Sequence, residues 1–474
     1  MPTSSLQRSA IEANSIAWIS WFNPSDPHGY IDWSTFQQLA HDWEAACENP
    51  AISAIVIHSQ GRDFSPGWNP DAWLYQDEAS LEKLILDTQD FLKRLEASPK
   101  PVIAAIHGKC LGPGMELSLA CHWVVTSLHS STVFGMDERN LGLVPALGAT
   151  VRLPRLVGLQ TALHVLLSGR TYSSVRCLKM GLANRVVVPD QLLATAGNKA
   201  NSMALGHNSP ARKLALDWVQ QAVERIWIGR RLILRHAAER INEITHEAFP
   251  APQLIMDATD TGWRRGMTEG LDLALKYALH ASKNPGTTSL LKLRRMALDR
   301  QQKGTTSNRS AFVRRLTVLG GGRMGKGLAK LGRKYDLHVD LIERNPFTLR
   351  NLGPWAKKRG VQIFSSEQYH PHLAAEFIIE AVDENLARKT QVLQQAESIL
   401  DPQGFIATNT STLSIQTLSE SLRRPGKLVG MHFFMPPGAM PLVEIIASQY
   451  TDPTVVDQAK GLASQLGKVW IQTS

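Results

Sequence analysis

The sequence contains no apolar run that approaches the roughly 18 residues of a membrane-spanning helix. Its first residues, MPTSSLQR, lack the apolar core of a secretion signal. We therefore expect a cytoplasmic protein without a membrane span. Long low-complexity tracts are absent too, and only 20% of the residues are charged against 43% hydrophobic ones. This composition indicates folded domains with buried cores and argues against extensive disorder.

Cysteine is scarce, and the positions of the four cysteines match neither of its two common structural uses. Cys47, Cys110, Cys121 and Cys177 have no CxxC spacing and no neighbouring histidine pattern. A zinc site and a disulfide framework are therefore not supported, and we expect reduced, mostly buried thiols and no metal.

Clustered positive charge is also limited, although the formal net charge is +9. The basic residues are spread along most of the chain, which does not favour a nucleic-acid-binding protein. An anionic small ligand that carries several phosphates suits the same charge.

The length of 474 residues predicts roughly three structural units. Residues 1–190 alternate short apolar segments with amphipathic ones. We expect strands at 17–21 and 54–58 and helices at 33–47 and 81–95. This order predicts parallel strands covered by helices.

A Gly-Pro-Gly turn, Gly112-Pro-Gly114, follows an expected strand at 101–106 and precedes an apolar helix with Glu116 in its first turn. Unpaired N–H groups at a helix start form a natural site for a developing oxyanion. Glu138 follows on the next turn of the same region, and two carboxylates are the minimum equipment for paired acid and base chemistry. The alternatives are an ordinary α/β crossover and two surface glutamates.

Several ordered motifs in this part resemble the enoyl-CoA hydratase (crotonase) superfamily, a fold of ββα repeats. They are the runs 107–121 (HGKCLGPGMELSLAC), 134–145 (FGMDERNLGLVP), 152–155 (RLPR) and 180–182 (MGL). The resemblance implies an acyl-CoA substrate and implies that Glu116 and Glu138 activate water and deliver a proton. It also implies that two backbone N–H groups bind the thioester oxygen, the first of them from Trp68.

Two positions depart from the pattern of that superfamily. The second N–H donor would come from Pro113, which has no N–H. Gly114 is the candidate substitute, and the Trp68 indole is expected to crowd the pocket. Efficient hydration, thioester binding with little turnover, and double-bond isomerisation with the same glutamates all remain open.

Residues 191–307 are predicted to form a helical linker. The break Phe249-Pro-Ala-Pro252 and the pattern Gly266-Met-Thr-Glu-Gly-Leu271 resemble the connecting segment of the multifunctional fatty-acid oxidation enzymes.

Residues 308–474 begin with a dinucleotide-binding pattern. A strand at 315–319 leads to Gly320-Gly-Gly-Arg-Met-Gly325, a helix at 326–334 and a second strand at 339–342 that ends at Glu343. This order predicts a Rossmann-type, doubly wound parallel sheet that binds NAD.

Each glycine of this pattern has an expected task. Gly320 would allow the tight turn, Gly322 the close approach of a pyrophosphate, and Gly325 the packing of helix on strand. Arg323 and Met324 lie in the same cofactor turn. Glu343 would accept hydrogen bonds from a ribose diol, which favours NAD over NADP, although the adjacent Arg344 leaves that preference open.

The remaining motifs resemble the 3-hydroxyacyl-CoA dehydrogenases. They are the runs 380–385 (EAVDEN), 409–412 (NTST), 430–434 (GMHFF) and 440–446 (MPLVEII). The resemblance implies that His432 removes the hydroxyl proton, Glu444 orients its ring and Ser411 hydrogen-bonds the substrate. Glu384 and Lys389 would lie at the edge of the cofactor and active site.

The dehydrogenase family continues into a helical domain, whereas this chain ends at Ser474. We expect either a fragment or a naturally shortened protein with an incomplete dehydrogenase site. The resulting hypothesis is a two-module fatty-acid oxidation enzyme that is oligomeric and can assemble with a thiolase β subunit. The alternative is a degenerate protein that binds acyl-CoA and NAD with weak or no turnover.

Overall fold

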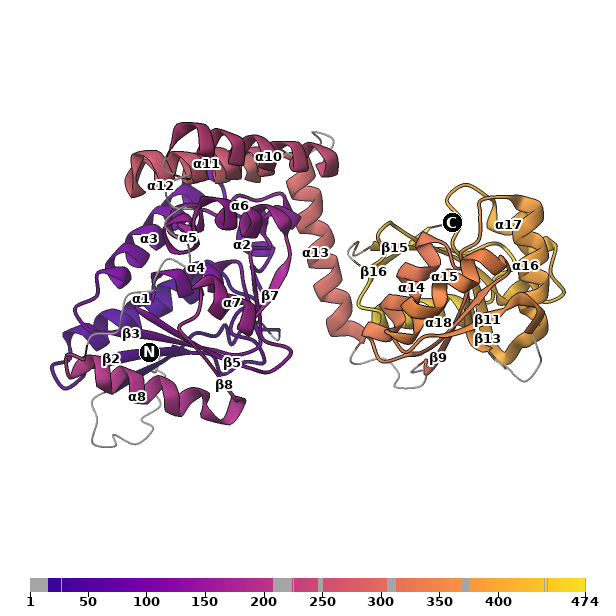
Figure 1. The fold of residues 1–474 in the computed structure, drawn as a ribbon, viewed down its shortest axis with the longest axis horizontal. Helices are drawn as coiled ribbons and strands as arrows, with labels where there is room; N and C mark the ends of the chain where they lie inside the picture. The colour runs from indigo at the N-terminus through magenta and orange to yellow at the C-terminus, as the bar shows by residue number, and fades with distance from the viewer. Residues whose placement is uncertain are drawn as a thin grey trace. The chain divides into compact units, whose positions relative to one another are not determined.

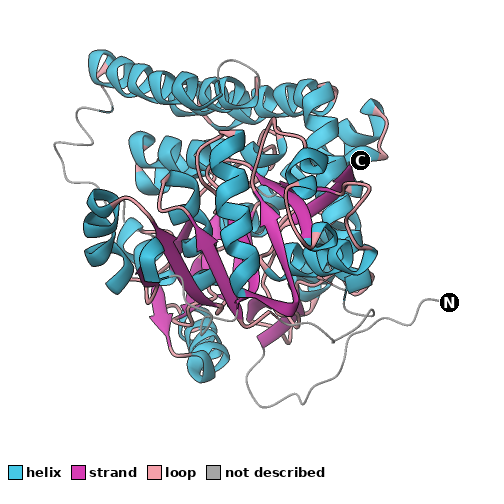
Figure 2. Cartoon of the chain, turned by 90° about the vertical axis from the view of Figure 1, so that its right-hand side faces the viewer, coloured by secondary structure: helices cyan, strands magenta, loops and turns pink. Residues whose placement is uncertain are grey.

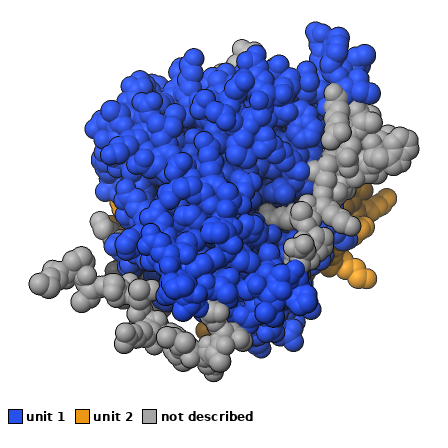
Figure 3. Space-filling model, turned by 90° about the vertical axis from the view of Figure 1, so that its left-hand side faces the viewer, with its two compact units in different colours: residues 1–295 blue, residues 296–474 orange. Residues whose placement is uncertain are grey.

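The structure is a computed structural model that describes residues 16–26, 28–207, 224, 226–245, 250–304, 313–368, 375–438, 440 and 442–473, without the side chains of 240–245 and 300–304. The chain divides into two compact units, Met1–Arg295 and Met296–Ser474 (Figure 3). Each unit has its own hydrophobic core, and each is described by itself.

Unit 1 is built on a five-stranded parallel sheet in the order β1-β2-β3-β5-β8. The strands are β1 (Ile16–Ser20), β2 (Ala54–His58), β3 (Val102–Ile106), β5 (Trp123–Ser127) and β8 (Arg185–Val187). The central strands β3 and β5 are buried along their whole length. Their continuous apolar runs are therefore those of a sheet covered on both faces.

A second, three-stranded sheet positions the Gly-Pro-Gly turn. It contains β4 (Lys109–Leu111), β6 (Val133–Gly135) and β7 (Thr171–Ser173), with β4 and β6 parallel and β6 and β7 antiparallel. Directly after β4, Gly112 adopts a φ of 49° and donates its N–H to the carbonyl of Gly135, at 3.0 Å. The turn at 112–114 and the segment after β6 are thereby held side by side.

Helices cover both faces of the main sheet (Figure 1). Figure 2 shows helices in cyan and strands in magenta over the described residues. The apolar side of α8 packs on β2, β3 and β5, while α1, α3 and α4 contribute to the larger core on the other face. The helices of this unit are α1 (Trp33–Glu48), α2 (Asp71–Leu74), α3 (Glu78–Glu96), α4 (Pro113–Ala120), η1 (Glu138–Leu141), α5 (Ala149–Val157), α6 (Leu159–Ser168), α7 (Ser174–Met180), η2 (Pro189–Gln191), α8 (Leu192–Ala204), α10 (Trp227–Thr245), α11 (Ala251–Arg265), α12 (Met267–Ser282) and the first part of α13 (Pro285–Gly304).

Helices α11 and α12, from the segment predicted as a linker, belong to unit 1 and pack against each other. Both also contact α5, and α12 contacts α3. At their closest approach Gly262 of α11 and Gly270 of α12 meet, so a Cβ on Gly270 would lie 2.6 Å from the Gly262 Cα. Residues 208–223 and Phe249 lie outside the described residues. The boundaries at 190 and 307 stay predictions.

Unit 2 contains an eight-stranded sheet in the order β11-β10-β9-β12-β13-β14-β15-β16. The strands are β9 (Arg315–Leu319), β10 (His338–Glu343), β11 (Gln362–Ser365), β12 (Ala375–Glu380), β13 (Leu400–Thr408), β14 (Leu428–Phe433), β15 (Leu442–Ile446) and β16 (Val469–Thr473). The first six follow the 3-2-1-4-5-6 order of a doubly wound sheet, in which the order of successive strands reverses between β9 and β12 while these two strands stay parallel.

Alternate residues of these strands face two separate cores, as expected when helices cover both sides. Helices α14, α15 and α18 pack on one face, while α16 and α17 pack on the other. Their bounds are α14 (Arg323–Lys334), α15 (Pro346–Lys357), η3 (Ser366–Gln368), α16 (Leu386–Ile399), α17 (Ile415–Glu420), η4 (Pro425–Lys427) and α18 (Pro453–Gln465). The predicted doubly wound fold is confirmed, with one addition: β14 and β15 pair antiparallel.

None of the described helices combines the length and the apolar character that a bilayer crossing requires.

Candidate functional site

Three carboxylates meet in unit 1, and we call Glu116, Asp137 and Glu138 the carboxylate cluster. Glu116 lies in the first turn of α4, and Glu138 begins η1 directly after Asp137. The side chains of Glu116 and Glu138 are 1% and 0% exposed. Among the described residues, both oxygens of Glu138 and one of Glu116 lack a hydrogen bond of the usual geometry. Buried and unpaired carboxylates are costly, so this cluster is a strong candidate for a functional site.

Glu116 is held by the loop that precedes α5. Its Oε1 accepts hydrogen bonds from the N–H groups of Leu147, at 3.0 Å, and Ala149, at 2.9 Å. Arg152, itself 3% exposed, donates to the Leu147 carbonyl at 2.9 Å and pairs with Glu96. One Glu116 oxygen is thus fixed, and the other is left available.

Asp137 lies between two glycines that belong to different turns. A Cβ on Gly67 would lie 2.7 Å from Asp137 Oδ2, and a Cβ on Gly112 would lie 2.8 Å from Asp137 Oδ1 and 2.9 Å from Glu138 Oε1. Only glycine fits at either position. The carboxyl groups of Asp137 and Glu138 therefore both border the Gly-Pro-Gly turn. The sequence led us to expect Glu138 on a turn next to that of Glu116.

Burial raises the pKa of all three carboxyl groups. The pKa of Glu116 rises to about 7, against the opposing hydrogen bond from Ala149 and the charge of Arg152. The pKa of Glu138 rises well above its usual value through burial and the charges of Asp137 and Glu116. Burial also raises the pKa of Asp137, opposed by Arg294 and Lys109. The cluster therefore retains protons near neutral pH, which acid and base chemistry requires.

The positions expected to bind an oxyanion are only partly equipped. The N–H groups of Trp68 and Gly114 have no acceptor among the described residues, whereas Pro113 is the first residue of α4 and carries no N–H. A Cβ on Gly114 would lie 2.8 Å from Ser65 Oγ, so the side-chain position of Gly114 is directed at Ser65.

The Trp68 indole is 2% exposed and packs in an aromatic group, with its ring centre 4.6 Å from that of Trp33 and 5.5 Å from that of Trp73. A weak hydrogen bond from the Trp68 side chain also opposes the raised pKa of Glu138. The expected crowding next to Glu138 is consistent with this placement.

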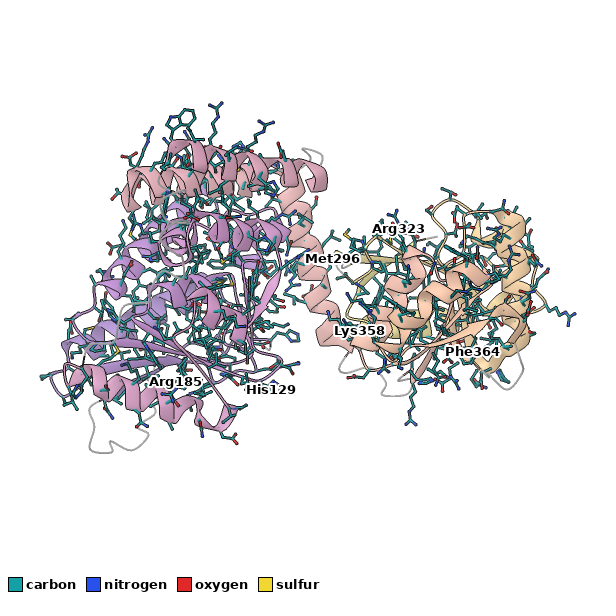
Figure 4. The ribbon with its side chains drawn as sticks, viewed as in Figure 1. His129, Arg185, Met296, Arg323, Lys358 and Phe364 are labelled. Carbon is teal, nitrogen blue, oxygen red and sulfur yellow. The ribbon has the colours of Figure 1, made fainter. Side chains whose placement is uncertain are left out.

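In unit 2, the glycine turn between β9 and α14 has the geometry of a phosphate cradle. Gly320 has a φ of 105°, and a Cβ there would meet the Ala381 carbonyl at 2.7 Å. No atom lies within 4 Å of a Cβ position on Gly322, so the start of α14 is open. Free N–H groups at an open helix start suit a pyrophosphate. Arg323, exposed at this start, is labelled in Figure 4.

The acid at the end of β10 is already bound to the backbone. Glu343 Oε2 accepts the Gly321 N–H at 2.7 Å, and Oε1 accepts the Asn345 N–H at 2.6 Å. Each carboxylate oxygen has two lone pairs, so Glu343 can still accept hydrogen bonds from a ribose diol. The residues present therefore fit NAD.

The antiparallel pairing of β14 and β15 places His432 directly opposite Glu444. The His432 Nδ1 lies 2.7 Å from Glu444 Oε2, and the two side chains are 21% and 31% exposed. An imidazole held at Nδ1 by a carboxylate keeps Nε2 for another partner. The predicted pair is therefore assembled by the strand register itself.

His432 lines a cavity of about 290 Å³. It gathers His432, Ser411, Glu384 and Met324 with six further residues, Ala381, Val382, Asn409, Phe433, Phe434 and Met435. The cavity adjoins the glycine turn at the carboxyl ends of β9 and β12, between which the strand order reverses. This is the usual position of a ligand in a doubly wound sheet.

Glu384 is occupied by the loop that carries Ser411. Its Oε1 accepts hydrogen bonds from the Thr410 hydroxyl at 2.5 Å and from the N–H groups of Ser411 and Thr412 at 2.9 and 3.0 Å. Burial opposes the effect, yet these bonds lower the pKa of Glu384 to about 2. Glu384 therefore fixes the Ser411 loop as a permanent anion.

Lys389 lies beneath the cavity and does not line it. It is fully buried and pairs with Glu380, which is equally buried, at 2.9 Å, while Glu384 is 3.6 Å away. It therefore neutralises Glu380 at the end of β12 and lies behind the cavity wall.

Four residues that sequence reasoning left without a role belong to these sites. Asp137 and Arg152 lie within sequence motifs but were assigned no role. The tertiary structure places Asp137 beside Gly67 and Gly112, and Arg152 against the 147–149 loop. Glu380 and Asn409 likewise stood unassigned in the dehydrogenase-like motifs. Asn409 Oδ1 accepts the Phe433 N–H at 2.7 Å and fixes the end of β14. Among the described residues, no three or more His, Cys, Asp or Glu side chains, the carboxylate cluster included, are arranged so that they could hold a metal ion.

Comparisons with protein families match both halves of the chain. Residues 12–226 match the family described as enoyl-CoA hydratase/isomerase. Residues 355–474 match the family described as 3-hydroxyacyl-CoA dehydrogenase, NAD binding domain.

Individual relatives match most of the length of this chain. The fatty acid oxidation complex subunit alpha of Shewanella sp. (strain MR-4) is 34% identical over 394 residues, which cover 79% of this chain and 55% of that protein. The subunit of the same name from Shewanella putrefaciens is 34% identical over 442 residues, 89% of this chain and 62% of that protein. The chain thus spans about half to three fifths of the length of these curated relatives. A solved structure of (S)-3-hydroxybutyryl-CoA dehydrogenase from Ralstonia eutropha is 29% identical, with a TM-score of 0.30, and covers 34% of this chain and 63% of that one.

Proposed function

We propose that the chain carries out two consecutive steps of fatty-acid β-oxidation, because residues 12–226 match the enoyl-CoA hydratase/isomerase family and residues 355–474 match the NAD-binding domain of the 3-hydroxyacyl-CoA dehydrogenases. The first is the hydration of a 2-enoyl-CoA to a 3-hydroxyacyl-CoA. The second is the oxidation of that product with NAD. The product of the first site is the substrate of the second, which gives the fusion of the two modules a chemical reason.

The observation that carries the proposal is the 2.7 Å contact of Glu444 with His432, which lines a cavity beside the glycine turn. His432 Nε2 accepts the proton of the substrate 3-hydroxyl group. Glu444 holds the ring through Nδ1–H and stabilises the imidazolium that forms. The Ser411 hydroxyl donates a hydrogen bond to the substrate oxygen.

The glycine turn and Glu343 hold the dinucleotide, with Gly322 leaving space for its pyrophosphate. NAD held there would supply the acceptor for the hydride that leaves the carbon bearing the hydroxyl. Met324 lines the cavity from the turn and brings the cofactor side of the site next to His432.

In unit 1, the carboxylate cluster supplies the hydration chemistry. Water adds its oxygen to C3 of the enoyl thioester and a proton reaches C2, with Glu116 and Glu138 as the groups that accept and deliver the protons. The pKa of Glu116, raised by burial to about 7, suits this exchange near neutral pH.

A second candidate function is thioester binding with little turnover. The observation that favours it is Pro113, since loss of one oxyanion donor typically lowers kcat by about 10²–10³. Isomerisation of the double bond by the same two glutamates stays a prediction.

Assembly with a thiolase β subunit and oligomer formation are part of the proposal, supported by the relatives' name as alpha subunits of a complex. The cytoplasmic location stays a prediction.

The test measures both steps on the purified chain. Crotonyl-CoA should lose its conjugated thioester absorbance, and the rate should fall at least about 10²-fold in Glu116→Gln and Glu138→Gln, since each removes a proton-transfer group. Glu82→Gln, on the exposed side of α3, is the matched control and should keep the rate. If the unaltered chain turns over crotonyl-CoA no faster than a variant that carries both Glu116→Gln and Glu138→Gln, hydration is excluded.

NADH formation from 3-hydroxybutyryl-CoA tests the second step. It should be lost in His432→Ala and retained in His338→Ala, a histidine at the start of β10 and outside the cavity. NAD binding without NADH formation by the unaltered chain would instead favour the binding-protein alternative.

A further inference from the structure

Pro113 leaves the thioester oxygen with one backbone donor fewer, and the question is which group in unit 1 replaces it. The first donor, the Trp68 N–H, follows Gly67, and the position without a donor, Pro113, follows Gly112. A replacement must therefore reach the space between the Gly67 and Gly112 turns.

The Asp137 carboxyl group occupies that space. Its Oδ2 faces Gly67, with 2.7 Å to an added Cβ, and its Oδ1 faces Gly112, with 2.8 Å to an added Cβ. Oδ1 is buried and has no hydrogen-bond partner among the described residues. The group that lies between the two turns thus has an unused bonding position there.

We propose that Asp137, in its protonated form, donates a hydrogen bond to the thioester oxygen and so replaces the N–H that Pro113 lacks. This proposal rests on the proposed hydration of an enoyl-CoA in unit 1. A neutral carboxylic acid is a competent oxyanion donor, provided that its surroundings keep it protonated.

The surroundings of Asp137 contain groups of both signs. The pKa of Asp137 is raised by burial and lowered by Arg294 of α13 and Lys109 of β4. Glu138 borders the same point beside Gly112, and the charge of Asp137 raises the pKa of both Glu138 and Tyr30. Like charges this close cannot all ionise, so the cluster shares protons.

The ionised form would act in the opposite direction. A carboxylate between the two turns would repel the oxyanion that develops during hydration. Ionisation of Asp137 is therefore expected to lower the hydration rate as the pH rises through its raised pKa, whereas protonation of Glu116, whose pKa is about 7, lowers the rate on the acid side.

The test compares Asp137→Asn, which keeps an N–H donor of nearly the same shape, with Asp137→Ala, which keeps none. Crotonyl-CoA hydration should fall about 10²–10³-fold in Asp137→Ala and stay within about tenfold in Asp137→Asn at low pH. The asparagine variant should also lose the pH-dependent limb that belongs to Asp137. Asp190→Asn, an exposed residue of η2, is the control and should keep the full pH profile.

A second measurement does not depend on turnover. A dimethylaminocinnamoyl-CoA thioester absorbs at longer wavelength when its carbonyl oxygen accepts strong hydrogen bonds. Bound to the unaltered chain at low pH, and to Asp137→Asn, the probe should show this shift. With Asp137→Ala the shift should be lost while the probe still binds.

The outcomes separate the donor from the proposed function. A shift without hydration would support the donor and contradict the hydratase function. Hydration that is equally fast in Asp137→Ala, a bound probe without a shift, or an unaltered chain that does not bind the probe would each overturn the role of Asp137.

Discussion

At the scale of single residues, the two glutamates of the carboxylate cluster are not equivalent. Glu116 has one oxygen fixed by two backbone N–H groups and a nearby Arg152, whereas Glu138 has no hydrogen bond that meets the usual geometry among the described residues. Glu138 therefore holds its proton more tightly. This difference suits Glu138 to deliver a proton and Glu116 to accept one.

The raised pKa of Glu116 predicts a specific pH dependence of stability. Its folded-state pKa of about 7 exceeds the usual 4.5, so the protonated group contributes stability below pH 4.5 that is lost as the pH rises through 7. Glu116→Gln removes this loss. At pH 8 the variant should be more stable than the unaltered chain by of order 1–3 kcal/mol, and at pH 4 nearly equal. Urea unfolding of unit 1, followed at both pH values, checks this; a stability difference that does not change with pH would contradict it.

The residue scale is also where sequence reasoning reached its limit. Glu116, Glu138, His432 and Glu444 were predicted as site residues because they stand in recognisable motifs, and their roles stay predictions. Asp137 stood in the same run as Glu138, yet its position depends on two glycines far away in the chain. Side-chain contacts across such separations carry no local periodicity, so they could not be predicted.

At the scale of elements, segments with a strong local pattern were predicted correctly. The predicted strands at 54–58 and 315–319 have the observed bounds of β2 and β9, because each is a short apolar run ended by turn residues. The three-stranded sheet of β4, β6 and β7 was not predicted. Each of its strands has only three residues, which is too short for a periodic pattern.

Gly325 is the element-scale contact most open to test. A Cβ there would collide with the Gly320 carbonyl, which is backbone and cannot turn aside. Gly325→Ala should therefore lift α14 from β9 and weaken NAD binding at least about tenfold, as expected for the glycine that packs helix on strand. Gly353→Ala in α15 is the control, because no atom lies within 4 Å of its Cβ position. Titration with NAD measures both, and equal affinities of the two variants would refute the role of Gly325.

At the scale of the whole molecule, each candidate site lies within one unit. The carboxylate cluster uses residues of unit 1, and the cavity at His432 uses residues of unit 2. Because the cores are separate, damage to one site should not spread to the other.

This separation predicts independent activities. Glu138→Gln should lower crotonyl-CoA hydration while NADH formation from added 3-hydroxybutyryl-CoA stays within twofold of the unaltered chain. His432→Ala should do the reverse. A variant that lowers both rates in parallel would show that the units depend on each other.

The antiparallel step from β14 to β15 separates two kinds of sequence change. His432 and Glu444 are held by a hydrogen-bonded strand ladder, whereas Phe434 and Met435 of the cavity wall belong to the connection between the strands. Insertions or substitutions in this connection can alter the shape of the cavity without moving the pair. We therefore propose that variants at Phe434 and Met435 would change the acyl-group preference while the proposed proton chemistry at His432 is kept.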